Sequence, residues 1–265
     1  MKRTAAVILI TLALCAAASA QSAASKPTRP RLNKATASGA SKSTAAADGE
    51  VERLLDRYVL AQGGAGLLAV KTRIMRGGVD LSLSPVSGKF ESYEKMPKKS
   101  LIVVNMPGGQ FIEASDGGKR WIKSPWAVVS LAVAEDPLSS AGGLRGAGGF
   151  KWRSLFSSAR VRGRAVVDGR ETVVLAATPV GRGPVLMYFD AETGLLSKQE
   201  FVRPGGGKDE ELQAIYIDSY ATVDGLKVPA LFRHVYPKFT MTFRVYEIKH
   251  NVHINDALFT DPNGN

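Results

Sequence analysis

The chain has 265 residues, 45% of them hydrophobic, with one cysteine and a net charge of +11. This length and apolar content suffice for a folded core without disulfides, so a disulfide-held miniature scaffold and a wholly disordered chain are both excluded. The excess charge is uneven, because Lys2 and Arg3 and five residues between Gln21 and Ala47 carry most of it, leaving about +4 for the remainder. A domain this nearly neutral is a poor partner for nucleic acid.

The first twenty residues form a targeting segment rather than a part of the fold. Lys2-Arg3 precede an apolar run from Ala5 to Leu14, and Ala18-Ser19-Ala20 is an A-x-A cleavage site. The apolar run is shorter than the ~20 residues that a membrane span needs, so export with cleavage after Ala20 is predicted over anchoring. The single cysteine, Cys15, follows the bulky Leu14, which disfavours lipid attachment. The mature chain then has no cysteine.

Residues 21–48 are predicted to be a disordered linker, rich in Ser, Ala, Thr, Lys and Pro. Five basic side chains and no acid before Asp48 make it cationic. Two interpretations stay open: contact of this basic tail with an anionic membrane or cell wall, and a solvated spacer.

A helix and a strand follow, and the rest of the domain, residues 49–265, is built on them. Apolar residues recur at helical spacing between Val51 and Val59, with Asp48 as the predicted N-cap and Gly63-Gly64 as the end. From Arg73 the period changes to two, so that Met75, Val79 and Leu81 share one face of a strand. The helix is expected to lie on the sheet that this strand begins.

From Thr72 onward the chain has the pattern of an antiparallel meander. Asp-Gly turns at Asp116, Asp168 and Asp224 predict hairpins, and Phe239 to Val245 alternates as a half-buried strand. Because the connections are short, strands adjacent in sequence are expected to be adjacent in one large, curved antiparallel sheet, an α+β fold. Ser124 to Phe156 is the exception: it is apolar on every side and then glycine-rich, which suits either a mobile cover or an ordinary packed insertion.

Catalytic and metal-binding patterns are missing from this sequence. No G-x-S-x-G, H-E-x-x-H or C-x-x-C occurs. Ser92 and Lys95, and likewise His250 and His253, are three residues apart, and on a strand that spacing directs side chains to opposite faces. We therefore predict no enzyme activity, no metal site and no cofactor.

Several segments resemble the LolA/LolB-like family of outer-membrane lipoprotein-sorting proteins, across roughly Glu50 to Pro262. They are Arg57-Tyr58 through Gly63-Gly64, Arg73-Ile-Met-Arg-Gly77, Asp116-Gly-Gly-Lys-Arg-Trp121, Tyr188-Phe-Asp-Ala-Glu-Thr-Gly-Leu-Leu196, Asp218-Ser-Tyr220 with Val223 to Pro229, and Lys249-His-Asn251 before Phe259. The resemblance implies an incomplete β-barrel wrapped around a helical lid. It also implies a periplasmic protein whose apolar cavity receives acyl chains.

The predicted partner is therefore a lipid or lipoprotein acyl chain, each buried methylene contributing about 0.8 kcal/mol. The residues expected to form the cavity wall and cover are Met75, Val79, Leu81, Val103, Phe111, Trp121, Trp126, Leu131, Met187, Phe232, Met241 and Phe243. The methionines suit an adaptable wall, although each one could equally be a core residue. The alternative function is an interaction or sensor module that binds another envelope protein; in either case a monomer is expected. An exported hydrolase is the third hypothesis, and it lacks a catalytic constellation.

Overall fold

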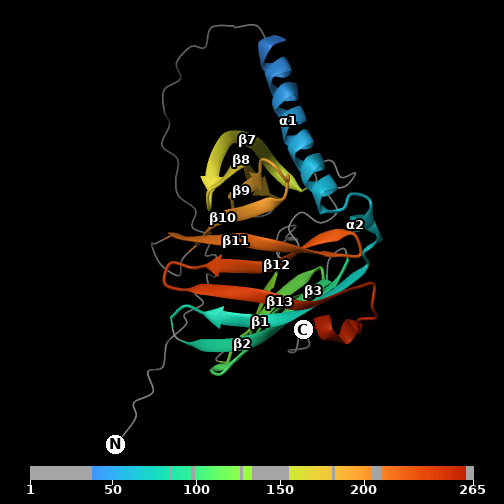
Figure 1. Ribbon diagram of the computed structural model, residues 1–265, viewed down its shortest axis with the longest axis vertical. Helices are drawn as coiled ribbons and strands as arrows, with labels where there is room; N and C mark the ends of the chain where they lie inside the picture. Colours follow the sequence, from blue (N-terminus) through green and yellow to red (C-terminus); the bar gives the residue numbers. More distant parts are fainter. Residues whose placement is uncertain are drawn as a thin grey trace, which may run out of the picture.

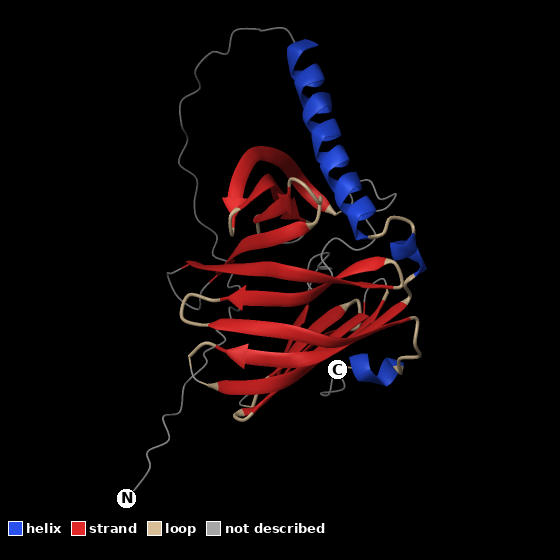
Figure 2. Cartoon of the chain, in the orientation of Figure 1, coloured by secondary structure: helices blue, strands red, loops and turns tan. Residues whose placement is uncertain are grey.

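The structure is a computed structural model that describes residues 38–83, 85–96, 99–125, 128–132, 155–180, 183–204 and 210–260. Its main feature is one open sheet of thirteen strands in which every pairing is antiparallel (Figures 1 and 2). The strands are β1 (Thr72–Leu81), β2 (Val86–Lys95), β3 (Lys99–Met106), β4 (Gly109–Ser115), β5 (Lys119–Lys123), β6 (Val128–Ala132), β7 (Phe156–Val167), β8 (Arg170–Pro179), β9 (Val185–Asp190), β10 (Leu196–Pro204), β11 (Glu210–Val223), β12 (Leu226–Val235) and β13 (Thr240–His250). The large curved antiparallel sheet is thus confirmed.

The strand order is β6-β5-β4-β3-β2-β1-β13-β12-β11-β10-β9-β8-β7. Strands adjacent in sequence are adjacent in the sheet, as expected, with one exception. β6 and β7 form the two opposite edges, and β1 pairs with β13 in the middle instead. Adjacency was expected from short connections, and it does not hold at this step because residues 133–155 separate β6 from β7.

The hairpin turns follow the local sequence. Asp168-Gly169 and Asp224-Gly225 both have two consecutive residues at positive φ, which is the geometry of a type I′ turn. At the β4–β5 turn, the Asp116 carboxylate accepts hydrogen bonds from the backbone N–H groups of Gly118 (2.8 Å) and Lys119 (2.7 Å). These bonds hold the pKa of Asp116 below its usual value. All three predicted Asp-Gly hairpins are confirmed.

In the described part of the chain, two helices precede the sheet, α1 (Ser38–Gln62) and the single turn α2 (Gly66–Ala69). α1 ends before Gly63-Gly64 as predicted, and Gly64 N–H donates to Val59 O. It begins at Ser38 rather than after Asp48, because the alanine-rich stretch before Asp48 also favours a helix. The helix thus extends into the segment that was expected to be linker. Residues 1–37, with the predicted leader and most of that linker, lie outside the described residues.

α1 lies over the β7–β10 end of the sheet (Figure 1). Its buried stripe packs on residues from β7 to β10; we call this group the helix-docking cluster, made of Val51, Leu55, Tyr58, Val59, Phe156, Leu175, Ala177, Val185, Met187, Phe189 and Leu196. The expectation that the helix packs on the sheet is confirmed. The helical lid remains a prediction. Among the described helices, none has the length and apolar character to cross a bilayer.

The other end of the sheet is covered by the C-terminal segment. The 3-10 helix η2 (Asp256–Phe259) follows β13 and turns back onto β3, and Asp256 forms ion pairs with Lys95 (2.7 Å) and Lys99 (3.4 Å). Phe259 and Ile254 are buried there against Ile74, Leu101, Ala114 and Trp121, a group that we call the C-terminal cluster.

The β9–β10 turn is held by a single buried carboxylate. Asp190 accepts hydrogen bonds from the backbone N–H (2.7 Å) and hydroxyl (2.8 Å) of Thr193 and from Glu192 N–H (3.1 Å), and it pairs with Arg170 (2.7 Å). Burial by itself would raise the pKa of Asp190, but these hydrogen bonds and the Arg170 charge together lower it. From α1, Arg57 donates to Ala191 O (2.7 Å) and Glu192 O (2.8 Å), so this turn also anchors the helix.

Replacing Asp190 with Asn should therefore reduce the free energy of unfolding by about 1–3 kcal/mol at neutral pH. Because the folded-state pKa lies below the ordinary value of 3.8, the carboxylate stabilises the protein fully above that pH. Its contribution is lost as the pH falls through the folded-state pKa. Urea unfolding of wild type and Asp190→Asn between neutral pH and pH ~2 tests this, and the two curves should converge at the acidic end. Asp56→Asn, at an exposed position of α1, is the control; a constant gap between wild type and Asp190→Asn at every pH would contradict the prediction.

Candidate functional site

One face of the sheet, here called the interior face, carries two of the three apolar clusters. Directly paired residues in an antiparallel sheet share a face. By register, Met187 is opposite Gln199 and Gln199 is opposite Ile215, while Ile217 is opposite Phe232. The helix-docking cluster is therefore continuous, across β11, with the apolar residues of β12, β13, β1 and β2.

The centre of this second group is a set of three aromatic rings. Phe232 and Phe243 are stacked with ring centroids 4.8 Å apart, and Phe90 meets Phe243 edge-on at 5.2 Å. Met75 and Val79 are fully buried beside them. We call the group the aromatic cluster; its buried members are Val70, Met75, Val79, Phe90, Val104, Leu226, Val228, Phe232 and Phe243.

Half of the predicted wall residues come together in this aromatic cluster. Met75, Val79, Phe232 and Phe243 are buried in it, and Phe111 and Met241 pack against it. The prediction that Met75 and Val79 point inward from β1 agrees with the strand register, because Val79 is directly opposite Phe243. Leu81 is half-buried at the end of β1, opposite Met241. Met187 lies on the same face but belongs to the helix-docking cluster.

Val103 and Trp121 were assigned to the wrong face. Trp121 is buried in the C-terminal cluster, with Val103 packed against that cluster on the opposite side of the sheet. The run from Ser100 to Met106 is apolar on both sides of β3, so its periodicity could not identify the inward side. Trp126 lies outside the described residues, as does the side chain of Leu131. Most of the segment from Ser124 to Phe156, interpreted as a cover, is also outside them.

Sequence reasoning missed two glutamines on the interior face. Gln199 and Gln213 are 6% and 3% exposed, and they neighbour Met187 and Phe201 by register. Gln199 Nε2 and Gln213 Oε1 are both buried and have no hydrogen-bond partner among the described residues. An unpaired buried amide atom costs about 1–3 kcal/mol. In the sequence, the only local sign of these buried amides was a glutamine at a position of an alternating strand where an apolar, inward-facing residue is expected.

His250 and His253 lie in different surroundings. The buried His250 imidazole accepts a hydrogen bond from Arg73 Nε at Nε2 (3.1 Å) and lies 2.9 Å from Asp224 Oδ2 through Nδ1, whereas His253 is exposed. Because Nε2 accepts a hydrogen bond, Nδ1 carries the ring proton and donates a hydrogen bond to Asp224 Oδ2. Among the described residues, no three His, Cys, Asp or Glu side chains are grouped as metal ligands.

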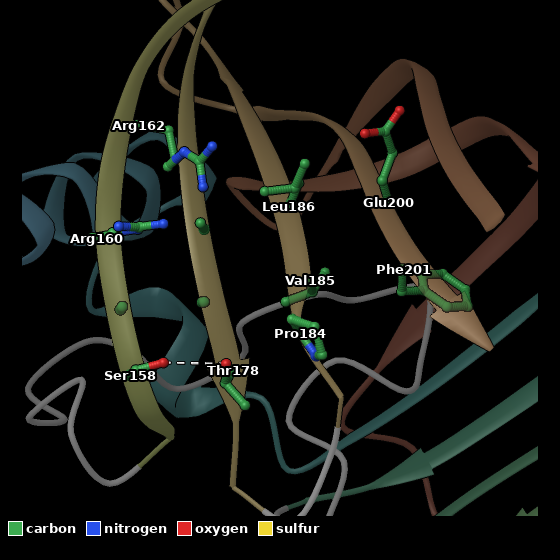
Figure 3. Close-up of a pocket in the computed structure, with 12 residues that line it drawn as sticks. Ser158, Arg160, Arg162, Thr178, Pro184, Val185, Leu186, Glu200 and Phe201 are labelled. Atoms are coloured by element: carbon green, nitrogen blue, oxygen red, sulfur yellow. Dashed lines mark hydrogen bonds between the residues drawn. The ribbon is translucent and has the colours of Figure 1, made fainter. Parts of the chain in front are cut away.

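The opposite face of the sheet is hollowed where β7 to β10 curl. The β7–β8 turn reaches back to β12, since Asp168 forms an ion pair with Arg233 (2.9 Å). Within this curl lies a cavity of about 530 Å³ (Figure 3). Its lining comes from β7 to β10 and the segment before β9: Ser158, Ala159, Arg160, Arg162, Ala176, Ala177, Thr178, Pro184, Val185, Leu186, Glu200 and Phe201. None of the predicted wall residues belongs to it.

Sequence reasoning missed this cavity as well. The available signal was the alternation Arg160-Val161-Arg162, which in a regular strand puts both arginines on one side. The hollow itself arises from the curl of four strands, which no local pattern reports.

The fold has counterparts among solved structures, although the sequence matches no protein-family model and no curated protein. A DUF1329 family protein from Desulfovibrio piger superposes with a TM-score of 0.53 at 13% identity, covering 81% of this chain and 99% of the other. A LolA superfamily protein from Nitrosomonas europaea gives 0.53 at 11% identity, with 79% and 96% covered.

An outer-membrane lipoprotein-sorting protein domain from Vibrio parahaemolyticus gives a TM-score of 0.50 at 12% identity, covering 78% of this chain and 95% of that domain. At these identities the likeness concerns the fold. The open antiparallel sheet with its N-terminal helix is therefore a LolA-like fold, as the sequence motifs suggested.

Proposed function

We propose that the protein is an exported, non-catalytic carrier that binds the acyl chain of a lipid or lipoprotein against the interior face of its sheet. The observation that carries this proposal is the pairing of a wide apolar face with two buried, unpartnered amide atoms, on Gln199 and Gln213. A solid core would be more stable with apolar residues at these two positions. A bound acyl amide could accept from Gln199 Nε2 and donate to Gln213 Oε1, and an acyl ester could accept from Gln199 Nε2, while the chain covers the apolar side chains.

Two further features support the proposal. The interior face offers methionines, Met75 and Met187, together with Met241 at its margin, and methionine repacks easily around a guest. The LolA-like fold is shared with a lipoprotein-sorting protein domain. The A-x-A site before Gln21 would deliver the chain to the periplasm, where such cargo is found.

Native mass spectrometry of the protein purified from the periplasm is the direct test. We expect a fraction of molecules to carry an additional mass equal to an acyl lipid, lost on delipidation. Bare protein that also fails to bind any acyl probe would contradict the carrier and leave the alternative, a module that binds another envelope protein.

The two glutamines permit a sharper experiment. In Gln199→Leu/Gln213→Leu, the free energy of unfolding of the empty protein should rise by about 1–3 kcal/mol for each unpaired amide that is removed. Affinity for a pyrene-labelled fatty acid methyl ester should fall about tenfold, the equivalent of ~1.4 kcal/mol, while affinity for a pyrene-labelled alkane of equal length is kept.

Gln110→Leu is the matched control, because Gln110 is exposed on β4, where its Nε2 donates to Asn105 Oδ1 (2.9 Å). It should alter neither affinity. Loss of stability in the double variant, with ester binding unchanged, would show that the glutamines are structural.

A further inference from the structure

The face opposite to the interior face is called the exterior face. Its cavity is built around one row of side chains that crosses four strands. By register, Arg160 of β7 is opposite Ala176 of β8, Ala176 is opposite Leu186 of β9, and Leu186 is opposite Glu200 of β10. One wall of the cavity is therefore cationic, and its floor is apolar. Ala176 is small, which leaves room between the arginine side and Leu186.

A second arginine is added to the same wall by a β-bulge. The β7–β8 register shifts between Val161 and Gly163, so Arg162 is the extra residue of β7. Bulges re-aim side chains, and Figure 3 shows Arg162 extending over β8 near Arg160. Among the residues that the structure describes, neither guanidinium has an ion-pair or hydrogen-bond partner.

The carboxylate on the far side does not neutralise these arginines, because it is already paired. Glu200 forms an ion pair with Lys198 and accepts a hydrogen bond from Tyr188 Oη (2.6 Å). Burial by itself would raise the pKa of Glu200, but these two partners lower it, so the carboxylate stays ionised and bound to Lys198. The cavity thus presents two uncompensated positive charges above an apolar floor.

We propose that this cavity is a second binding site, specific for an acyl lipid with an anionic phosphate headgroup. Guanidinium groups bind phosphate oxygens through paired hydrogen bonds, so Arg160 and Arg162 together can hold one headgroup. Leu186 and Ala176 would contact the start of its acyl chain, and the volume of about 530 Å³ is that of an ordinary small-ligand site. The row from Arg160 to Glu200 lies on the opposite face from the interior, and its phosphate binding does not depend on the interior binding an acyl chain.

An acidic peptide added as a strand to β7 is the competing occupant, since β7 is an edge strand of the sheet. The bulge at Arg162 argues against it, because bulges and exposed basic residues are the means by which edge strands avoid pairing. The lipid also accounts for the apolar floor, which an added strand at the edge would not reach.

Calorimetric titration with short-chain dihexanoyl phosphatidylglycerol, below its micellar concentration, tests the proposal. We expect binding at least tenfold tighter than that of dihexanoyl phosphatidylcholine or of inorganic phosphate alone. Arg160→Gln/Arg162→Gln should lose at least tenfold in affinity, and so should Ala176→Phe, which fills the cavity and keeps both arginines. Should Ala176→Phe not fold, Ser158→Trp fills the same space from an exposed position.

Arg164→Gln is the matched control, since Arg164 lies on the same strand outside the cavity and pairs with Glu171 (2.7 Å); it should bind within twofold of wild type. Gln199→Leu/Gln213→Leu should also bind within twofold, which separates this site from the interior. Equal affinity for both lipids, or for inorganic phosphate, would overturn the proposal, as would unchanged binding in Ala176→Phe. A glutamate-rich peptide whose binding is lost in the double arginine variant but kept in Ala176→Phe would identify the edge of β7 as the site instead.

Discussion

Gly77→Ala is expected to be among the most destabilising single-methyl additions in this protein. An ideal Cβ at Gly77 would lie 1.9 Å from Arg244 O and 2.5 Å from Phe90 Cε1. Gly77 sits at the irregularity where β1 changes register against β13, so the absent side chain lets the two backbones and the Phe90 ring close together. Since a backbone carbonyl cannot rotate away as a side chain does, the central strand pair must separate.

The expected loss is about 3 kcal/mol in the free energy of unfolding, or roughly 6–12 °C in melting temperature. Gly78→Ala is the control at the next position. Its Cβ would meet Tyr246 Oη at 2.6 Å, but Tyr246 is 76% exposed and its ring can move. That variant should remain within about 1 kcal/mol of wild type. Comparable losses in the two variants would show that strand propensity, rather than the close approach, determines the result.

Leu55→Ala should detach α1 from the sheet. Leu55 is 3% exposed in the helix-docking cluster, next to the turn of helix from which Tyr58 meets Phe189 edge-on at 5.2 Å. Deleting a buried leucine side chain costs about 2–5 kcal/mol, depending on how far the site can collapse. Because α1 meets the sheet through one apolar stripe, we place the expected loss in the upper half of that range. Thermal unfolding and hydrogen exchange of the α1 amides measure it.

Leu60→Ala provides the comparison within the same helix, because Leu60 is 75% exposed. It makes the identical chemical change without opening a cavity, and it should alter stability by less than about 0.5 kcal/mol. Amide exchange in α1 should accelerate in Leu55→Ala and stay as in wild type in Leu60→Ala. Full protection of α1 in Leu55→Ala would mean that the helix is held mainly by Arg57 and its two carbonyl partners at the β9–β10 turn.

Features that depend on a few neighbouring residues could be predicted from the sequence alone. The turns at Asp116, Asp168 and Asp224 formed as expected, because Asp-Gly and Asp-Gly-Gly satisfy local hydrogen bonds and positive φ without help from the rest of the chain. The end of α1 at Gly63-Gly64 and the inward parity of β1 were predictable for the same reason. The family motifs are mostly such turns, which is why they indicated the fold correctly.

Features that depend on long-range pairing could not be predicted from the sequence alone. The sequence of β3 is apolar on both sides, and only its pairing with β2 and β4 determines that Val104 faces the aromatic cluster while Val103 faces the C-terminal cluster. The pairing of β1 with β13, and with it the placing of β6 and β7 at opposite edges, likewise joins residues far apart in the chain.

The candidate sites divide in the same way. The sequence by itself determined that this is a sheet protein with a strongly apolar face and one N-terminal helix, since periodicity and turn residues act locally. Only the tertiary structure decided that Gln199 and Gln213 are buried on that face, and that Arg160, Arg162 and Leu186 surround one cavity. The physical reason is that curvature and register are properties of several strands together, so a residue's surroundings are set by partners that its own neighbours in sequence do not specify.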